Sequence, residues 1–248
     1  MAVFQLINLM ALMIKLRMFI IFTALLLQGF AAIASNEFNG RWYAFAKVKT
    51  DLNMKPGMNT KRAKAIICTG CHGADGNNDN PDYPRLAGQH KSYLIKQLTD
   101  FKKGYRKEEH MTAMAGAISY NDIPDIAHYF SVQKIKRLAP VKKNKDLDKY
   151  SSIKKSLFLK EGKKLYQYGN TKKSITACAS CHGINGRGLA SQQYPVLAGQ
   201  HKAYLLKALR AFRFGKRYND KNSLMRNIVL KLTNDDIKAL ASYLASLE

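Results

Sequence analysis

The sequence is poor in acidic residues, cysteine and tryptophan. Its 248 residues include 17 Asp and Glu against 41 Lys and Arg, with four cysteines and one tryptophan. Four cysteines are too few for the dense disulfide framework of a small secreted scaffold. A hydrophobic fraction of 46% excludes a basic disordered tail, which would be poor in apolar residues. The length therefore suits one or two folded domains.

Convincing strand alternation is also lacking, whereas several segments show helical periodicity. Tyr93, Leu94, Leu98 and Phe101 recur with a period near 3.6, and Gly104 is placed to end that helix. The second half repeats the pattern with Tyr204, Leu205, Leu209, Phe212 and Gly215. We therefore predict an all-α protein.

Two pairs of side chains resemble capping boxes and predict the final helix of each half. They are Ser119 with Asp122, and Thr233 with Asp236. Pro124 follows the first pair, so that helix has an alternative start at Asp122. A further short helix is predicted over 61–67, with Asn59 or Thr60 as its cap.

The N-terminus has the pattern of a targeting segment. Residues 18–36 carry no charge, Lys15 and Arg17 precede them, and small residues at 32–34 allow cleavage before Ser35. We predict a signal peptide over 1–34, with an uncleaved membrane anchor as the alternative, because the run is just long enough to span a bilayer. Residues 35–59 form an extension without a counterpart in the second half.

The chain repeats itself. Residues 86–98 and 197–209 are identical at 10 of 13 positions, which predicts two homologous domains, over 60–138 and 152–248. Residues 131–164 contain twelve Lys or Arg and three acids, which is typical of an exposed connection. We place a basic linker over 139–151.

Both cysteine pairs are followed directly by histidine, in the motifs Cys68-Thr69-Gly70-Cys71-His72 and Cys178-Ala179-Ser180-Cys181-His182. This pentapeptide is the attachment signature of c-type haem. Two thiols a turn apart form thioethers with the haem vinyl groups, and the histidine becomes the proximal iron ligand. A zinc site would need a fourth ligand, and a thioredoxin-like pair a strand–helix setting. We therefore predict two covalently bound haem c groups.

The repeat also selects candidate distal ligands. Met111 and Met225 each lie eight residues before a predicted cap, Ser119 and Thr233, whereas Met114 has no partner in the second half. Methionine opposite histidine is an established haem pairing. We predict that Met111 and Met225 ligate iron and that Met114 packs in the core.

The remaining histidines are weaker candidates. His90 and His201 match across the repeat but follow the proximal histidines by only 18 and 19 residues. We expect them to be helix-start or surface residues. His110 and His128 have no equivalents in the second half.

Residues 60–248 resemble the dihaem cytochrome c4 family. The resemblance is carried by both Cys-x-x-Cys-His motifs, both Pro-x-Leu-Ala-Gly-Gln segments, Met111 and Met225. It implies two class I cytochrome c domains in tandem, packed around a pseudo-twofold axis. It also implies that the backbone carbonyls of Pro84 and Pro195 orient the proximal histidines.

The resemblance further implies a periplasmic or membrane-associated electron carrier between a quinol-oxidising respiratory complex and a terminal oxidase. The formal charge of +24 would steer it to acidic docking faces on redox partners. We expect a monomer that performs no catalysis and binds no nucleic acid, since no nucleic-acid module is recognisable. The alternatives are a dihaem peroxidase, which needs an open iron position and an acid–base residue such as His110, and a membrane-anchored oxidase subunit.

Overall fold

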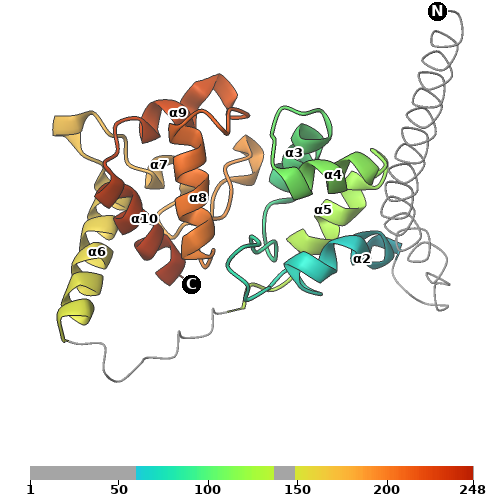
Figure 1. Ribbon diagram of the computed structural model, residues 1–248, viewed down its shortest axis with the longest axis horizontal. Coiled ribbons are helices and arrows are strands. Elements are labelled where there is room, and N and C mark those ends of the chain that lie inside the picture. Colours follow the sequence, from blue (N-terminus) through green and yellow to red (C-terminus); the bar gives the residue numbers. More distant parts are fainter. Residues whose placement is uncertain (1–59, 137–148, 248) are drawn as a thin grey trace, which may run out of the picture. The chain divides into compact units, whose positions relative to one another are not determined.

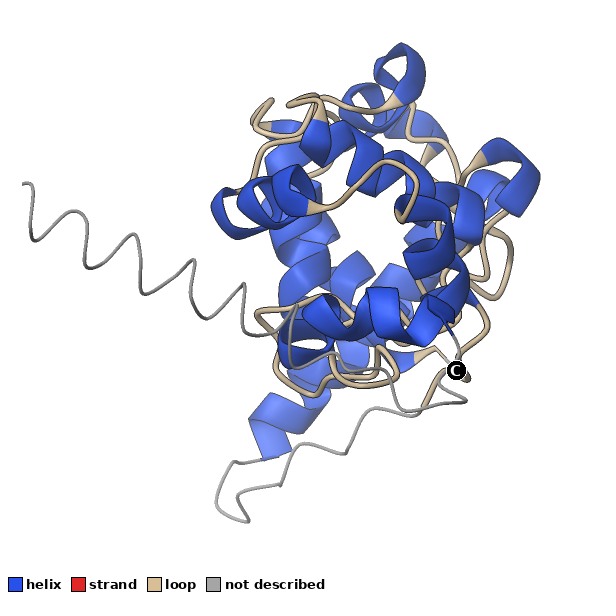
Figure 2. Cartoon of the chain, turned by 90° about the vertical axis from the view of Figure 1, so that its right-hand side faces the viewer, coloured by secondary structure: helices blue, strands red, loops and turns tan. Residues whose placement is uncertain are grey.

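The computed structural model describes residues 60–136 and 149–247 (Figure 1). All regular structure in these ranges is helical, apart from two isolated bridges, Asn170–Ile175 and Leu189–Tyr194 (Figure 2). The all-α prediction is confirmed. The predicted signal peptide or anchor, the 35–59 extension and most of the 139–151 linker lie outside the described residues.

The first domain consists of four helices around one apolar core. They are α2 (Thr60–His72), α3 (Lys91–Lys102), α4 (Glu109–Ala117) and α5 (Ile123–Ser131). Helix α5 packs on α2 and α3, and α3 also packs on α4. The fully enclosed side chains include Ile123, Ile126 and Phe130 from α5. The helix predicted over 61–67 is present but continues through the Cys-x-x-Cys-His motif.

The second domain is built in the same way from five helices. They are α6 (Lys149–Tyr168), α7 (Ala179–His182), α8 (Lys202–Arg213), α9 (Leu224–Val229) and α10 (Asn234–Ser246). Short 3-10 turns cover Thr171–Lys173, Ala190–Gln192 and Lys221–Ser223. Helix α10 packs on α6 and α8, and its Ile237, Leu240 and Leu244 enter the core.

Helices α3 and α8 match the sequence prediction at both ends. Gly104 and Gly215 stand just beyond them, each with a positive φ that other residues adopt only with strain. His90 and His201 are the N-cap residues of these helices. The helix-start prediction for both is confirmed, but His201 is 5% exposed and therefore not a surface residue.

Only one of the two predicted capping boxes forms. The Thr233 hydroxyl accepts a hydrogen bond from the Asp236 N–H, and the Asp236 carboxylate accepts one from the Thr233 N–H. The box at Ser119 is wrong, because α5 begins only after Asp122. Pro124 explains the later start, since proline lacks an N–H and fits the first turn of a helix but not its interior. The Asp122 carboxylate instead forms an ion pair with Lys64, 3.1 Å away.

Helix α6 corrects the interpretation of residues 131–164 as an exposed connection in its last part, because residues 149–164 are helical. It begins at Lys149, inside the linker predicted over 139–151, and it buries Leu165 and Tyr166. At Gly162 it crosses α10 so closely that a Cβ would lie 2.2 Å from the Ala239 carbonyl oxygen. The lysines of this segment described by the structure lie on the exposed side of the helix. The many lysines of this segment therefore favoured a linker in the sequence analysis, although the segment forms a helix with one buried face.

None of the helices within residues 60–136 and 149–247 has the length and hydropathy of a membrane span. The uncharged run at 18–36 lies outside this range.

Candidate haem sites

In the first domain, the motif residues share one helix face at the end of α2. Cys71 and His72 follow Cys68 by three and four positions, and side chains at these spacings lie on the same face of a helix. His72 is only 4% exposed, and Cys68 packs against the core of the domain. The helix continues to His72 and so fixes the two thiols and the imidazole relative to one another.

The second domain reaches the same arrangement by a different local route. Cys178 is the N-cap of the short helix α7, which contains Cys181 and ends at His182. The buried Tyr166 of α6 donates a hydrogen bond of 2.6 Å to the Gly183 carbonyl, next to the motif. The motif is thus held by the neighbouring helix α6 rather than by a long helix of its own.

Each motif histidine is oriented by a proline carbonyl. His72 Nδ1 lies 2.8 Å from Pro84 O, and His182 Nδ1 lies 3.1 Å from Pro195 O. A carbonyl oxygen can only accept, so Nδ1 carries the proton and Nε2 is left as an electron-pair donor. Burial lowers the pKa of both histidines, which keeps them neutral. A neutral, oriented imidazole is the form that binds iron.

The cysteines are free thiols in environments that favour the protonated form. Burial raises the pKa of Cys68 to about 12 and that of Cys178 to about 11. Neither motif forms a disulfide, so both sulfur atoms of each remain available for thioether bonds.

Sequence reasoning gave no role to the tyrosine before each proline. The Tyr83 ring lies 6.2 Å from the His72 ring, and the Tyr194 ring lies 6.2 Å from that of His182. The matched positions of these tyrosines in the repeat were the signal available in the sequence.

The candidate distal methionines lie on helices that follow the motif helices. Met111 is in the first turn of α4, where its N–H donates to the Glu108 side chain, and Met225 is in the first turn of α9. Met111 packs against the same apolar cluster as Cys68, and Met225 against the same cluster as Cys178.

The other candidates take no part in this arrangement within the described residues. Met114 is half-buried, and His110 is exposed on α4. The His201 ring donates through Nε2 to the Asn78 carbonyl oxygen at 2.7 Å, so it serves as a contact between the domains.

The residues present fit haem c, because they supply thiols for the thioether bonds, axial donors for the iron and hydrogen-bond donors for a haem carboxylate. Each domain offers two thiols, one imidazole nitrogen and one thioether sulfur in or beside an apolar core. Two buried nitrogens, Arg85 Nε and His90 Nε2, have no hydrogen-bond partner among the described residues. Burying a polar group without a partner is unfavourable, and a haem carboxylate is the kind of acceptor that such nitrogens require.

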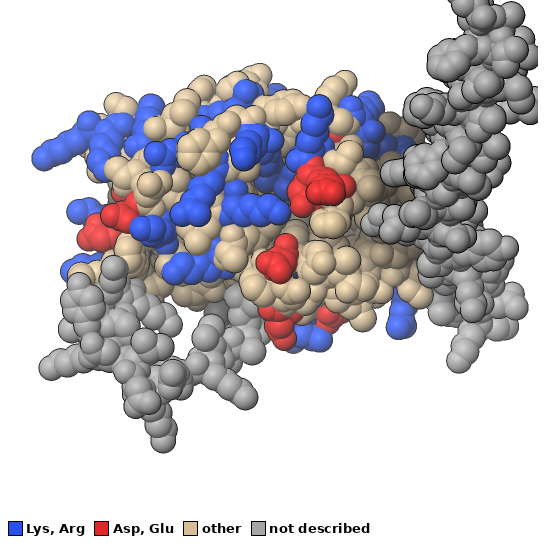
Figure 3. All heavy atoms as spheres, viewed as in Figure 1, with Lys and Arg blue, Asp and Glu red and all other residues tan. Residues whose placement is uncertain are grey.

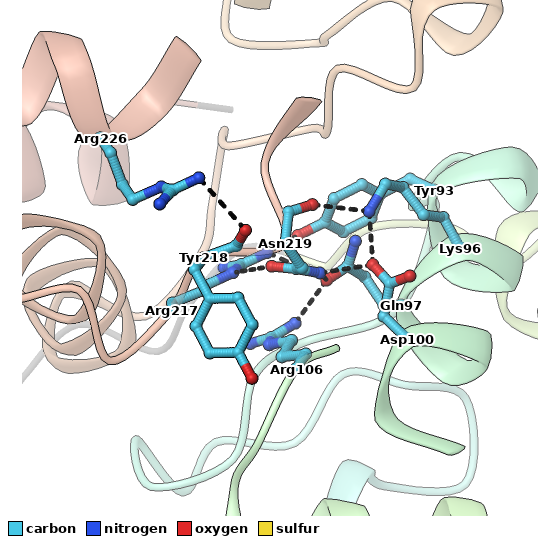
Figure 4. Close-up of polar contacts among 9 residues, drawn as sticks. All are labelled: Tyr93, Lys96, Gln97, Asp100, Arg106, Arg217, Tyr218, Asn219 and Arg226. Atoms are coloured by element: carbon cyan, nitrogen blue, oxygen red, sulfur yellow. Dashed lines mark hydrogen bonds and ion pairs between the residues drawn. The ribbon is translucent and has the colours of Figure 1, made fainter. Parts of the chain in front are cut away.

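The two domains meet through pairs of contacts that the repeat relates to each other. Arg106 donates to the Tyr204 hydroxyl at 3.1 Å, and Arg217 donates to the Tyr93 hydroxyl at 3.0 Å. Both arginines also donate to Gln97 Oε1, at 2.8 and 3.0 Å. Burial opposes ionisation of Tyr204, but the two arginines outweigh it and lower its pKa to about 8. We call the contacts Arg106–Tyr204 and Arg217–Tyr93 the arginine pairs; Figure 4 shows the second pair and both arginines beside Gln97.

Asn219 extends this interface, as Figure 4 shows. Its side chain donates to Gln97 Oε1 at 3.0 Å and to the Asp100 carboxylate at 2.6 Å, and its carbonyl accepts from Lys96. Sequence reasoning missed the whole interface, although Arg106 with Arg217 and Tyr93 with Tyr204 occupy equivalent positions in the repeat.

Comparisons with known proteins agree with this arrangement. A family model described as cytochrome c matches residues 61–139 and 159–248. Cytochrome c4 of Pseudomonas aeruginosa is 38% identical over 187 residues, covering 75% of this chain and 86% of that protein. A "thiosulfate dehydrogenase electron acceptor" of Thiomonas intermedia is 33% identical, covering 74% of this chain and 79% of that protein.

A solved structure shows the same fold. Reduced recombinant cytochrome c4 from Pseudomonas stutzeri has a TM-score of 0.68 and 38% identity, covering 76% of this chain and 97% of that one. The family model, the matched repeat and these relatives lead to one conclusion. The chain belongs to the cytochrome c family and, within it, to the dihaem cytochromes c4, electron-transfer proteins with two covalently bound haem c groups.

Proposed function

We propose that this cytochrome is an exported electron carrier in which both irons have six ligands and neither performs substrate chemistry. Cys68 and Cys71 attach the first haem, and Cys178 and Cys181 the second. His72 and His182 are the proximal ligands. The main support is the buried imidazole in each domain, which a proline carbonyl orients so that Nε2 is left to bind iron.

Met111 and Met225 complete the coordination in this proposal. Each packs against the apolar cluster that also contacts the first cysteine of its motif. Haem c supplies an iron that alternates between ferrous and ferric states, and a methionine ligand raises its reduction potential relative to histidine. The chain holds both axial side chains, excludes water and limits rearrangement when the charge changes.

The second domain is the docking side for acidic partners. Residues 149–247 contain 19 Lys and Arg against 4 Asp and Glu, whereas residues 60–136 contain 12 against 8. Figure 3 shows lysine and arginine side chains crowding the part of this face where Figure 1 places α8 and α9. Such a surface accelerates the encounter with a negatively charged partner, and weak redox complexes need only small interfaces.

The partners that we propose are a quinol-oxidising respiratory complex as donor and a terminal oxidase or similar acceptor. The relative named as an electron acceptor of thiosulfate dehydrogenase supports a second class of donor, a periplasmic dehydrogenase. The proposed location is the periplasm, with residues 1–34 removed. Sequencing the N-terminus of the mature protein tests this, since Ser35 at the first position excludes a retained anchor.

The coordination is tested by the optical spectrum of the reduced protein with and without carbon monoxide. An unchanged spectrum is expected, because methionine closes both irons. Binding at one haem would contradict the proposal and would favour the peroxidase alternative, in which His110 would have to act.

Met225→Ala gives the matched test at a single ligand. We expect a protein that keeps both haems, binds carbon monoxide at the second one and has a changed second reduction potential. Met114→Ala should leave the spectrum and both potentials as they are. Unchanged potentials in Met225→Ala would disprove the assignment.

A further inference from the structure

Two buried glutamines cross between the domains and pair with the backbone of the opposite domain. Gln89 Nε2 donates to Val196 O at 3.0 Å, while Gln89 Oε1 accepts from Val196 N at 2.9 Å. Gln200 does the same with Arg85, with distances of 2.9 Å in both directions. The repeat relates these two contacts, which we call the glutamine bridges.

Of the two backbone groups that each bridge binds, the N–H belongs to the peptide that orients a proximal histidine. Val196 N–H and Pro195 C=O are the two polar groups of one peptide unit, and Pro195 O accepts from His182. Likewise, Arg85 N–H shares a peptide unit with Pro84 O, which accepts from His72. Each histidine is thus linked, through one planar peptide, to a side chain of the other domain.

The environment makes these links rigid. Gln89 and Gln200 are 7% and 8% exposed, and Arg85 and Val196 are 6% and 8% exposed. Each glutamine oxygen also accepts from the next N–H of its own chain, that of His90 or His201, at 3.0 Å. Both ends of each amide are therefore held, and water has little access to compete for the bonds.

We propose that Gln89 is a positioning residue for the second-domain haem and Gln200 for the first-domain haem. Hydrogen bonds in series polarise one another, so an acceptor on the peptide N–H makes the proline carbonyl a stronger acceptor. That carbonyl then draws the histidine Nδ1 proton more strongly and makes the imidazole a more basic ligand. A more basic ligand stabilises ferric iron and lowers the reduction potential. The inference rests on the proposed ligation by His72 and His182.

The test is a crossed pattern in single variants of the haem-loaded protein. Gln89→Met keeps the length of the side chain but removes its amide, and it should raise the potential of the second-domain haem more than that of the first. Gln200→Met should do the reverse. Two-dimensional NMR assigns the signals of each haem to its domain, and mass spectrometry checks that both haems are attached.

Hydrogen exchange of backbone amides gives a second measurement. In Gln89→Met the Val196 amide should exchange about tenfold faster, as expected for the net loss of one hydrogen bond. The Arg85 amide should respond in the same way to Gln200→Met. In the unmodified protein both amides should exchange slowly, and exchange at the rate of exposed loops would overturn the inference even if the variants do not fold.

Tyr204→Phe is the control for a loosened interface, because it removes one arginine pair without touching the proline peptides. It should leave the difference between the two potentials as in the unmodified protein. Equal movement of both potentials in all three variants, or no movement in the glutamine variants, would overturn the inference. Failure of the underlying ligation is distinguished by NMR of the oxidised, unmodified protein, in which the ring signals of His72 or His182 would then lack the paramagnetic shift that bonding to iron causes.

Discussion

At the scale of single residues, the position of one carbonyl oxygen decides how each motif histidine points. His182 depends on Pro195 O, and that oxygen is enclosed by a tight turn of the same loop. Gly188 forms the other side of the turn with φ +72°, and its N–H donates to His182 O at 2.7 Å. The orientation of the His182 imidazole therefore depends on a residue that carries no functional group.

Gly188→Ala should disturb the second haem selectively. An added Cβ would lie 2.3 Å from Tyr194 O and 2.7 Å from Pro195 O, so the acceptor of the His182 hydrogen bond must move. We expect a changed potential and absorption spectrum at that haem and a loss of stability above about 2 kcal/mol, more than left-handed backbone strain alone produces. Redox titration and denaturant unfolding measure the two effects.

Gly215→Ala is the matched control, because Gly215 has a similar φ of +67° but nothing within 4 Å of its added Cβ. It should lower the stability by about 1–2 kcal/mol and leave both potentials unchanged. A haem spectrum unaffected by Gly188→Ala would contradict the role given to this turn.

At the scale of helices, equivalent elements of the two domains are stabilised differently. Helix α10 has a complete capping box, whereas α5 begins with Pro124 in its first turn and no side-chain cap. Ser119 accepts only from the N–H of Asn121, at 3.3 Å. The same short motif thus has different structural consequences in the two halves.

Thr233→Ala should therefore destabilise the protein more than Ser119→Ala does. Loss of a capping hydroxyl reduces stability by about 1 kcal/mol, and we expect less than half of that at Ser119. Hydrogen exchange in α10 and α5, together with denaturant unfolding, measures the difference. Equal effects of the two substitutions would show that the box contributes nothing.

The capping box also predicts a pH dependence. Burial alone would raise the pKa of Asp236, but hydrogen bonds from Thr233 and the charge of Lys173 outweigh it and lower the pKa. The stabilisation is therefore complete above the ordinary carboxyl pKa and is lost as the pH falls through the lowered value. At pH 7, Asp236→Asn should have a lower free energy of unfolding than the unmodified protein. This difference should vanish at a pH below the lowered pKa of Asp236, where its carboxyl group is protonated in the folded protein.

At the scale of the whole molecule, charge is divided unequally between two domains with the same fold. Residues 149–247 carry most of the net positive charge, although both domains hold equivalent haem motifs. An uneven charge distribution orients a diffusing protein before contact. We therefore expect electrons to exchange with anionic partners mainly through the second domain.

Stopped-flow oxidation of the reduced protein by hexacyanoferrate(III) tests this orientation. The rate should fall as salt is added, because ions screen the attraction of the anion to exposed lysines. Lys216→Glu with Lys221→Glu in the second domain should slow the reaction more than Lys103→Glu with Lys107→Glu in the first. All four lysines are exposed. Equal slowing by both pairs would remove the basis for a preferred docking side.

Much of the chemistry could be predicted from local sequence, because haem attachment depends on residues that are neighbours in the chain. Cys68, Cys71 and His72 need only a helical turn to come together, and the second motif repeats them. The repeat predicted the helices with period 3.6, since their burial pattern is also local. Helix α6 was missed because its lysines dominate the composition, whereas its burial depends on contact with α10, far away in the chain.

The sequence by itself determined the haem type, the number of domains and the helical class, all of which follow from short motifs and their repetition. Only the tertiary structure showed which start α5 adopts, that His201 is buried, and that Gln89 and Gln200 reach the proline peptides of the opposite domain. The physical reason is the separation in sequence between the residues that meet. The contacts of His201, Gln89 and Gln200 join residues more than 100 positions apart, and no local pattern specifies which side chains meet when two domains pack.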